Sequence, residues 1–403
     1  MSDQQHSSTL GDEKSRDYTR ETTAKFFREL TFPVIAVIVA FIIGLVMIVI
    51  MGKDPWVAYG ALFNGAFGNL GQLGETLVTV TPLICTGLAI AFAYKCGLFN
   101  IGAEGQYIMG LLVAAVVGIY GKGLPAYIHI PLTMIAGMAG GALWAAIIGL
   151  LKALVGAHEV INSIMLNYVA YYFSNLVVRV LITQQANTAV TPDIADTAKL
   201  ASFAQINSGF SSSRASVAIF VAVFAAVVAW FILRYTVTGF GIRATGLSRY
   251  AAEAGGIKSK KNIIMAMCIS GAFAGLGGTL MVMGAAYKGS LLLAFPGFGM
   301  DGISVALVGN NNPFGIIFSA ILFGVLAKGG PMMQLSGIPK EIVGIMQGVI
   351  ILFVVANIAR IAYDAIKRKR DRDKDMIPPK TRRFFGWDKR KTAAETTGQG
   401  GTK

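Results

Sequence analysis

Charged residues are scarce in this sequence. Asp, Glu, Lys and Arg make up only 14% of the 403 residues, whereas a typical soluble domain has about 25%. Hydrophobic residues make up 54%, and they form runs that approach the roughly 20 residues a helix needs to cross a bilayer. This composition leaves no room for a large soluble enzyme domain and predicts an all-α polytopic membrane protein.

Cysteine and histidine are also rare, with three of each. Cys85, Cys96 and Cys268 lie in or beside apolar segments without metal-like spacing, which argues against a disulfide framework or a metal site. The histidines are widely scattered, and no nucleophile, base and orienting group can be grouped from the sequence. We therefore expect no metal, no cofactor and no catalysis in this chain.

A phosphate-binding loop is missing as well. The sequence contains no Gly-x-x-x-x-Gly-Lys-Ser/Thr motif, so the chain lacks the usual means of binding ATP. The basic residues after residue 360 have neither interleaved aromatics nor a recognisable fold around them, so no nucleic-acid partner is expected. Basic residues next to membrane spans instead indicate the cytoplasmic side.

Ten membrane crossings are predicted, one of them a short, glycine-interrupted segment at residues 298–308. The other nine are residues 33–52, 75–94, 107–120, 126–151, 159–182, 215–233, 262–285, 314–327 and 341–359. Residues 53–74 are expected to form an interfacial helix. Basic segments follow the second, fourth, sixth and tenth crossings, which places both termini in the cytoplasm.

The chain is therefore divided into three parts. We expect a disordered cytoplasmic tail over residues 1–31, a transmembrane domain over residues 32–359 and a basic cytoplasmic tail over residues 360–403 that can contact anionic membrane lipid.

Asp301 and Lys328 lie near apolar runs, and we interpret both as structural charges at segment ends.

An acid and two amides lie between two apolar runs at residues 99–106, Phe-Asn-Ile-Gly-Ala-Glu-Gly-Gln. An unpaired ionisable group at membrane depth costs at least about 2.5–3.5 kcal/mol, so Glu104 needs a function or a buried partner. Gly102 and Gly105 permit an unwound turn or a close backbone approach, as in a translocation path. The alternative is a cytoplasmic turn in which Asn100 caps the next helix and Glu104 lies in its first turn.

Further amides lie in the segment 159–182. Asn162 and Asn167 are about 140° apart on a helix, where they could line a cavity or hold helices together. The candidate pathway residues are Asn100, Gly102, Glu104, Gly105, Gln106, Asn162 and Asn167.

Small residues four apart occur in two other segments, at Gly137 and Gly141 and at Gly271 and Gly275. This spacing lets helix backbones pack closely inside a membrane.

The most basic internal segment, residues 234–261, holds six basic residues and one acid, Glu253. A short capped helix from Ser248 to Ala254 is predicted, with Arg249 and Glu253 paired on one face. An ordinary basic cytoplasmic loop would satisfy the charge alone.

These motifs carry a family resemblance. Residues 97–106, Gly-Leu-Phe-Asn-Ile-Gly-Ala-Glu-Gly-Gln, resemble the signature of permease subunits of ABC importers for nucleosides and simple sugars. The resemblance continues at residues 156–167, 241–257 and 305–310, and leaves both tails outside. In that family the basic segment resembles the coupling helix that docks into the ATPase subunit, which assigns coupling to Arg243, Arg249, Glu253, Gly255 and Gly256.

Two function classes remain. The resemblance implies a permease subunit in the bacterial cytoplasmic membrane that moves nucleosides, with purine nucleosides preferred over simple sugars. It also implies three partners: a second related permease subunit forming a heterodimer, a cytoplasmic ATP-binding subunit and an external lipoprotein that binds the solute. The alternative is an ion-coupled secondary transporter in which Glu104 and Asp301 bind the coupling ion.

Overall fold

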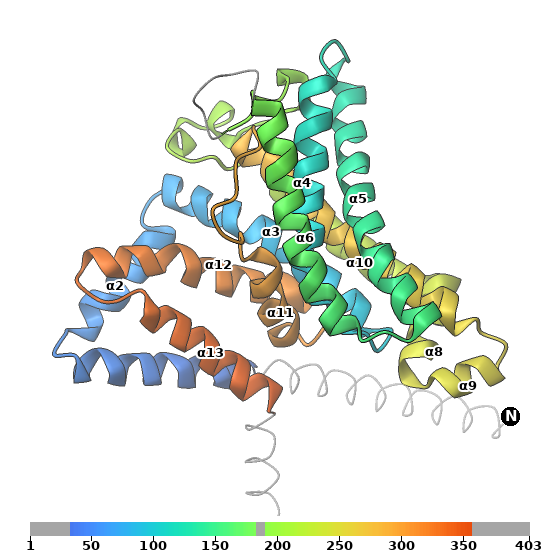
Figure 1. The fold of residues 1–403 in the computed structure, drawn as a ribbon. Helices are drawn as coiled ribbons and strands as arrows, with labels where there is room; N and C mark the ends of the chain where they lie inside the picture. Colours follow the sequence, from blue (N-terminus) through green and yellow to red (C-terminus); the bar gives the residue numbers. More distant parts are fainter. Residues whose placement is uncertain (1–32, 183–189, 357–403) are drawn as a thin grey trace, which may run out of the picture. The chain divides into compact units, whose positions relative to one another are not determined.

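The computed structural model describes residues 33–182 and 190–356, nearly all of them helical (Figure 1). The elements in order are the Pro33–Ile50 helix, α2 (Pro55–Phe67), α3 (Leu70–Tyr94), α4 (Ala103–Tyr120), α5 (Ala126–Leu150) with the π-turn Leu151–Val155, α6 (Glu159–Ile182), three short 3₁₀ turns (Asp196–Ala198, Phe203–Gln205, Ser208–Phe210), α7 (Ala218–Tyr235), α8 (Val237–Leu247), α9 (Arg249–Ala254), α10 (Ser259–Met281) with the π-turn Val282–Ala286, α11 (Phe298–Val308), α12 (Pro313–Leu335) and α13 (Glu341–Val355). Within these ranges β-pairing is limited to isolated bridges, which confirms the all-α class. The predicted tails lie outside the described residues.

Seven of the described helices are long and apolar enough to cross a membrane. They are the Pro33–Ile50 helix, α3, α4, α5, α7, α10 and α12, with the π-turns extending α5 and α10. The 24-residue α6 and the two shorter apolar helices, α11 and α13, lie where the remaining three crossings were predicted but are not among these seven. The helices therefore agree with a polytopic membrane protein.

Several helix boundaries differ from the predicted ones, most of all the start of α3 and the end of α12. α3 begins at Leu70 rather than at residue 75, because the Asn69 side chain accepts a 2.8 Å hydrogen bond from the Gln72 N–H and starts the helix there. α2 and the start of α3 thus replace the predicted interfacial helix. α12 continues past residue 327 to Leu335, close to Gly337, whose positive φ of 76° suits the end of a helix.

α10 packs against α3, α4 and α5, and glycine makes these contacts close. The two predicted small-residue motifs meet: a Cβ at Gly275 would lie 2.5 Å from the Gly137 carbonyl oxygen, and one at Gly141 would clash with the Gly271 carbonyl. On another side, a Cβ at Gly110 of α4 would also clash with Gly275. The backbones of three helices therefore touch, which maximises dispersion contact where lipid supplies no hydrophobic driving force.

α11 is a short helix that enters the helical layer from a non-helical segment. It packs against α3, where the Thr86 hydroxyl donates a 2.8 Å hydrogen bond to the Phe298 carbonyl and Gly302 lies against Thr86. At its other end the chain turns through Asn310 and Asn311, which both have positive φ, and Asn312 caps α12. Non-helical residues therefore separate α11 from the helices before and after it in the sequence.

Substitution of Gly275 by alanine should destabilise the protein, because the added methyl group meets backbone atoms that cannot move aside. We expect a loss of about 1–3 kcal/mol from overpacking, measured as a lower Tm of the purified protein. Gly344→Ala is the matched control, since Gly344 is also helical and a Cβ there meets nothing within 4 Å. Equal Tm values for the two variants would contradict the close packing of α5 and α10.

Candidate translocation and coupling sites

Glu104 lies in the first turn of α4, but its carboxylate reaches across to α11. Its side chain is only 1% exposed. Oε1 accepts a 2.7 Å hydrogen bond from the Gly297 N–H, and Oε2 accepts bonds of 2.6 and 3.2 Å from the N–H groups of Gly299 and Met300. The buried partner predicted for Glu104 is therefore the N-terminus of the other glycine-broken segment.

This contact has a clear physical cause. The first turn of a helix leaves N–H groups without intrahelical partners and carries a partial positive charge, so a carboxylate is favoured there. In α11 the N-cap is Gly297, which has no side chain to satisfy these groups. Gly299 also lies so close to the Glu104 backbone that a Cβ would clash with it. Glu104 thus replaces the missing cap from a residue distant in sequence.

Asn100 and Gln106 form a closed amide pair instead of lining open space. Asn100 Nδ2 donates to Gln106 Oε1 at 2.8 Å, and Gln106 Nε2 donates back to Asn100 Oδ1 at 3.0 Å. Asn100 also donates to the Ser270 hydroxyl at 2.7 Å, which in turn donates to the Ala89 carbonyl of α3 at 2.6 Å. The alternative in which Asn100 caps α4 is wrong, because the N-cap is Gly102 and no side chain bonds to it.

Of the two amides on α6, Asn167 holds helices together. Its Oδ1 accepts the Gly105 N–H at 2.8 Å and its Nδ2 donates to the Ile101 carbonyl at 3.1 Å. Gly105 allows this approach, since a Cβ there would lie 2.9 Å from Asn167 Oδ1. The amide nitrogen of Asn162 is buried and has no hydrogen-bond partner among the described residues, so Asn162 is not part of this network.

The turn between α3 and α4 folds back into the protein. Gly102 at the end of this turn lies against Ile148 of α5. The α5 helix with its π-turn extends beyond Ile148 to Val155, about 10 Å further along the helix axis at 1.5 Å per residue. Residues 95–102 therefore connect α3 to α4, and Glu104 lies in the first turn of α4, as the alternative expected.

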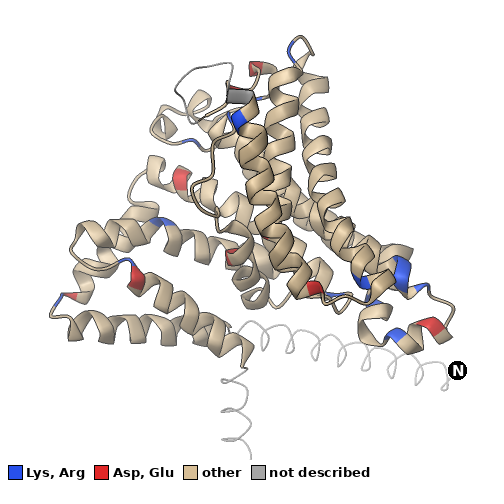
Figure 2. Ribbon diagram, in the orientation of Figure 1, with Lys and Arg blue, Asp and Glu red and all other residues tan. Residues whose placement is uncertain are grey.

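The predicted coupling segment forms the expected helix, α9. Ser248 caps it by accepting the Ala251 N–H at 3.3 Å, and the Arg249 guanidinium lies 3.3 Å from the Glu253 carboxylate. The helix ends at Gly255, and Gly256 follows with a φ of 80°. Figure 2 shows basic residues gathered around α8, α9 and the start of α10.

Two exposed apolar side chains beside α9 were missed in the sequence. Leu247 is 89% exposed and Tyr250 is 86% exposed. The clue was available, since both lie within the basic segment and flank Ser248. The other predicted coupling residues lie on or directly after α9, whereas Arg243 lies on α8, which packs against α7 and α10.

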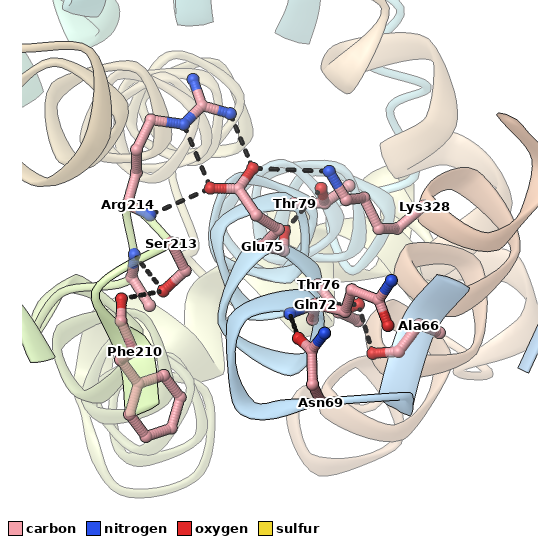
Figure 3. Close-up of polar contacts among 11 residues, drawn as sticks. Ala66, Asn69, Gln72, Glu75, Thr76, Thr79, Phe210, Ser213, Arg214 and Lys328 are labelled. Atoms are coloured by element: carbon pink, nitrogen blue, oxygen red, sulfur yellow. Dashed lines mark hydrogen bonds and ion pairs between the residues drawn. The ribbon is translucent and has the colours of Figure 1, made fainter. Parts of the chain in front are cut away.

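A third polar cluster links the start of α3, at Glu75, to two other parts of the chain (Figure 3). The Glu75 carboxylate accepts bonds from the backbone N–H, Nε and Nη2 of Arg214, the last at 2.7 Å, and lies 3.5 Å from the Lys328 ammonium. The bond to Glu75 raises the pKa of the Arg214 guanidinium, which stays charged. Lys328 pairs with Glu75 from inside α12, so it is not at a segment end as predicted, because α12 continues to Leu335.

Comparison with known proteins identifies the family. Residues 72–355 match the family described as "Branched-chain amino acid transport system / permease component". The chain belongs to this permease family. Its named relatives are permease proteins of ABC transporters, so the chain is a membrane subunit without ATPase activity of its own, and the ion-coupled secondary transporter gains no support.

Several relatives of this permease carry names. It is 40% identical to the guanosine ABC transporter permease protein NupP of Bacillus subtilis, over 86% of this chain and 99% of NupP. It is 36% identical to the nucleoside ABC transporter permease protein NupB of Lactococcus lactis, over 82% of this chain and 92% of NupB. A second guanosine permease protein of Bacillus subtilis, NupQ, is 30% identical over 62% of this chain and 78% of NupQ.

Glu104→Ala should destabilise the permease more than Glu104→Gln does. Alanine leaves three N–H groups at the start of α11 without their acceptor, and each buried unsatisfied group costs about 1–3 kcal/mol. Glutamine keeps one acceptor oxygen but places an NH₂ group against N–H donors. We therefore expect Tm to fall in the order wild type, Gln, Ala, with the exposed Glu341→Gln as the control. A wild-type Tm for Glu104→Ala would contradict the capping role.

Proposed function

We propose that this permease is one of two related membrane subunits of an ABC importer that moves nucleosides, purine nucleosides above all, into a bacterial cell. The observation that carries this is the 40% identity to a guanosine permease across 99% of that protein's length. In the proposed assembly, both termini face the cytoplasm, a cytoplasmic subunit hydrolyses ATP and an external lipoprotein delivers the solute.

A heterodimer is favoured over a homodimer. Bacillus subtilis has two different guanosine permease proteins, and this permease is similar to both, but it matches NupP at higher identity and over more of its length than NupQ. Lactococcus lactis shows the same pattern with NupB and NupC, at 36% and 24% identity. This permease therefore takes the place of the NupP-like subunit, and a NupQ-like chain is its partner.

The proposed coupling route starts at α9 and ends at α11. α8 contacts the start of α10 through the bond from Asn262 Nδ2 to Thr245 Oγ1, 3.2 Å long, and α9 contacts it through the Ser259 hydroxyl, which donates a 3.4 Å bond to the Arg249 carbonyl. Gly246 of α8 also lies directly against the backbone of Lys95 and Cys96, at the beginning of the α3–α4 connection. That connection leads to Glu104 and so to the N-terminus of α11. A displacement of α9 by the ATPase would therefore be passed to both glycine-broken segments.

The candidate pathway residues divide into two roles on this proposal. Asn100, Gln106, Asn167, Gly102 and Gly105 keep the α3–α4 connection buried and rigid, and Glu104 ties it to α11. Asn162, whose buried amide nitrogen has no hydrogen-bond partner in the described chain, is the member of the set that lies outside both roles.

Uptake into vesicles tests the proposed function. The complete importer is reconstituted, the ion gradient is dissipated and ATP is held constant. We expect guanosine uptake that requires the ATPase subunit and ATP. Uptake that follows an ion gradient and ignores ATP would contradict the proposal, and uptake of glucose but not of guanosine would replace the nucleoside by a simple sugar.

Tyr250→Ala should weaken docking of the ATPase subunit, because an exposed aromatic side chain on a small helix is a typical binding anchor. We expect at least about a 5-fold loss of ATPase subunit copurifying with the permease, the effect of about 1 kcal/mol. Tyr127→Ala is the matched control, since Tyr127 is 78% exposed at the opposite end of α5 from its π-turn. Unchanged copurification for Tyr250→Ala would remove α9 from the interface.

A further inference from the structure

An apolar cavity opens between the start of the Pro33–Ile50 helix and the first half of α12. Its volume is about 330 Å³, within the range of about 300–1,000 Å³ that small-molecule sites have. Val34 and Ile38 form part of one wall, and Phe318 and Leu322 form part of the other. None of the described residues that line it is charged. An apolar cavity of this kind excludes water and takes up apolar molecules.

The open side of the cavity continues into a membrane-facing surface. The Pro33–Ile50 helix has the length and composition of a membrane span, but only 22% of it is buried. Its exposed side chains Val34, Ile38, Ile42 and Val46 are spaced four apart, so they form one stripe along the helix. The first two also line the cavity. A stripe of this kind on a membrane span lies against the acyl chains of the bilayer, and the cavity is therefore open to lipid.

The polar lining of the cavity consists of two amides and one hydroxyl. Asn310 and Asn312, both exposed, lie at the end where α11 turns into α12. Ser319, on the α12 wall, is only 5% exposed, and its hydroxyl has no hydrogen-bond partner among the described residues. A buried hydroxyl normally has a partner. This lining suits an amphiphile with one long apolar part, whereas a nucleoside has polar groups around its whole edge.

Aromatic contacts show on which side of the membrane the amide end lies. Phe314, which lines the cavity, packs against Trp230 of α7 with ring centroids 5.9 Å apart, and Trp230 packs against Tyr235 at 5.2 Å. Tyr235 ends α7, and α8 follows after Thr236. The amide end therefore lies on the side of α8 and α9. Trp and Tyr are enriched at the headgroup level of a membrane, and the exposed Arg234, one turn after Trp230, adds a cation there.

We propose that this cavity binds one phospholipid of the cytoplasmic leaflet, with an acyl chain between the Pro33–Ile50 helix and α12 and its polar end at Asn310 and Asn312. The choice of leaflet rests on the orientation given under the proposed function, whereas the class of ligand does not. The amides and the Ser319 hydroxyl donate hydrogen bonds to phosphate or ester oxygens, and Arg234 favours the phosphate charge.

Bound lipid would support the turn between α11 and α12. Asn310 and Asn311 in this turn both have positive φ, and Val308 at the end of α11 lines the cavity. Glu104 binds the opposite end of the same helix. The lipid and Glu104 therefore fix α11 from its two ends.

Phospholipid retained by the assembled importer after purification in mild detergent tests this site, with native mass spectrometry as the readout. Ile38→Trp fills the cavity from an exposed wall position, and an acyl chain that loses the burial of two methylene groups binds about tenfold more weakly. Ile42→Trp is the matched control, since Ile42 is equally exposed one turn further along the helix but outside the cavity, and it should retain lipid like wild type. Ser319→Ala removes only a hydroxyl, so retained lipid should fall about 2- to 10-fold even if Ile38→Trp fails to assemble.

A photoreactive residue identifies the occupant. Phe318 lines the cavity and is 70% exposed, so p-benzoylphenylalanine in its place should cross-link to phospholipid in the purified importer. Cross-links to residues 1–32 of the same chain or to another subunit would overturn the inference. Equal lipid retention in the two Trp variants, or no retained phospholipid in wild type, would also overturn it. Failure of nucleoside uptake with normal lipid retention would instead reject only the proposed function.

Discussion

The bond between the Glu104 carboxylate and the N-terminus of α11 is the interaction on which the centre of this permease depends. A helix that begins inside an apolar layer has several N–H groups that water cannot reach, and they must be satisfied by the protein. The glycines at 297 and 299 permit a close backbone approach but offer no cap of their own. One carboxylate from α4 supplies the acceptors, and its charge is compensated by the helix dipole.

A continuous set of contacts connects Glu104 and α11 to the candidate coupling helix α9. α4, which carries Glu104, packs against the glycine-lined face of α10, and the turn before it contacts α8 through Gly246. The helix α9 that we assign to ATPase docking is therefore separated from α11 by the α8 contact and one short connection.

Local features were predictable from the sequence, and long-range partners were not. The Ser248 cap and the Arg249–Glu253 pair depend on neighbours within four residues, so α9 was predicted correctly. The two small-residue motifs were recognised, but their mutual contact was not, because spacing says nothing about which helix faces which. The partner of Glu104 is a set of backbone N–H groups 193 to 196 residues away, which no side-chain pattern reveals. The same holds for Glu75, whose acceptor role joins Arg214 and Lys328 from two distant segments.

Hydrogen exchange at the start of α11 tests the central role of Glu104 most directly. In the assembled importer, the amides of Gly299 and Met300 should be strongly protected, because they are bound to a buried carboxylate. We predict that Glu104→Ala removes this protection at α11 while amides in the middle of α10 keep theirs. Unchanged protection at Gly299 and Met300 in Glu104→Ala would contradict the account.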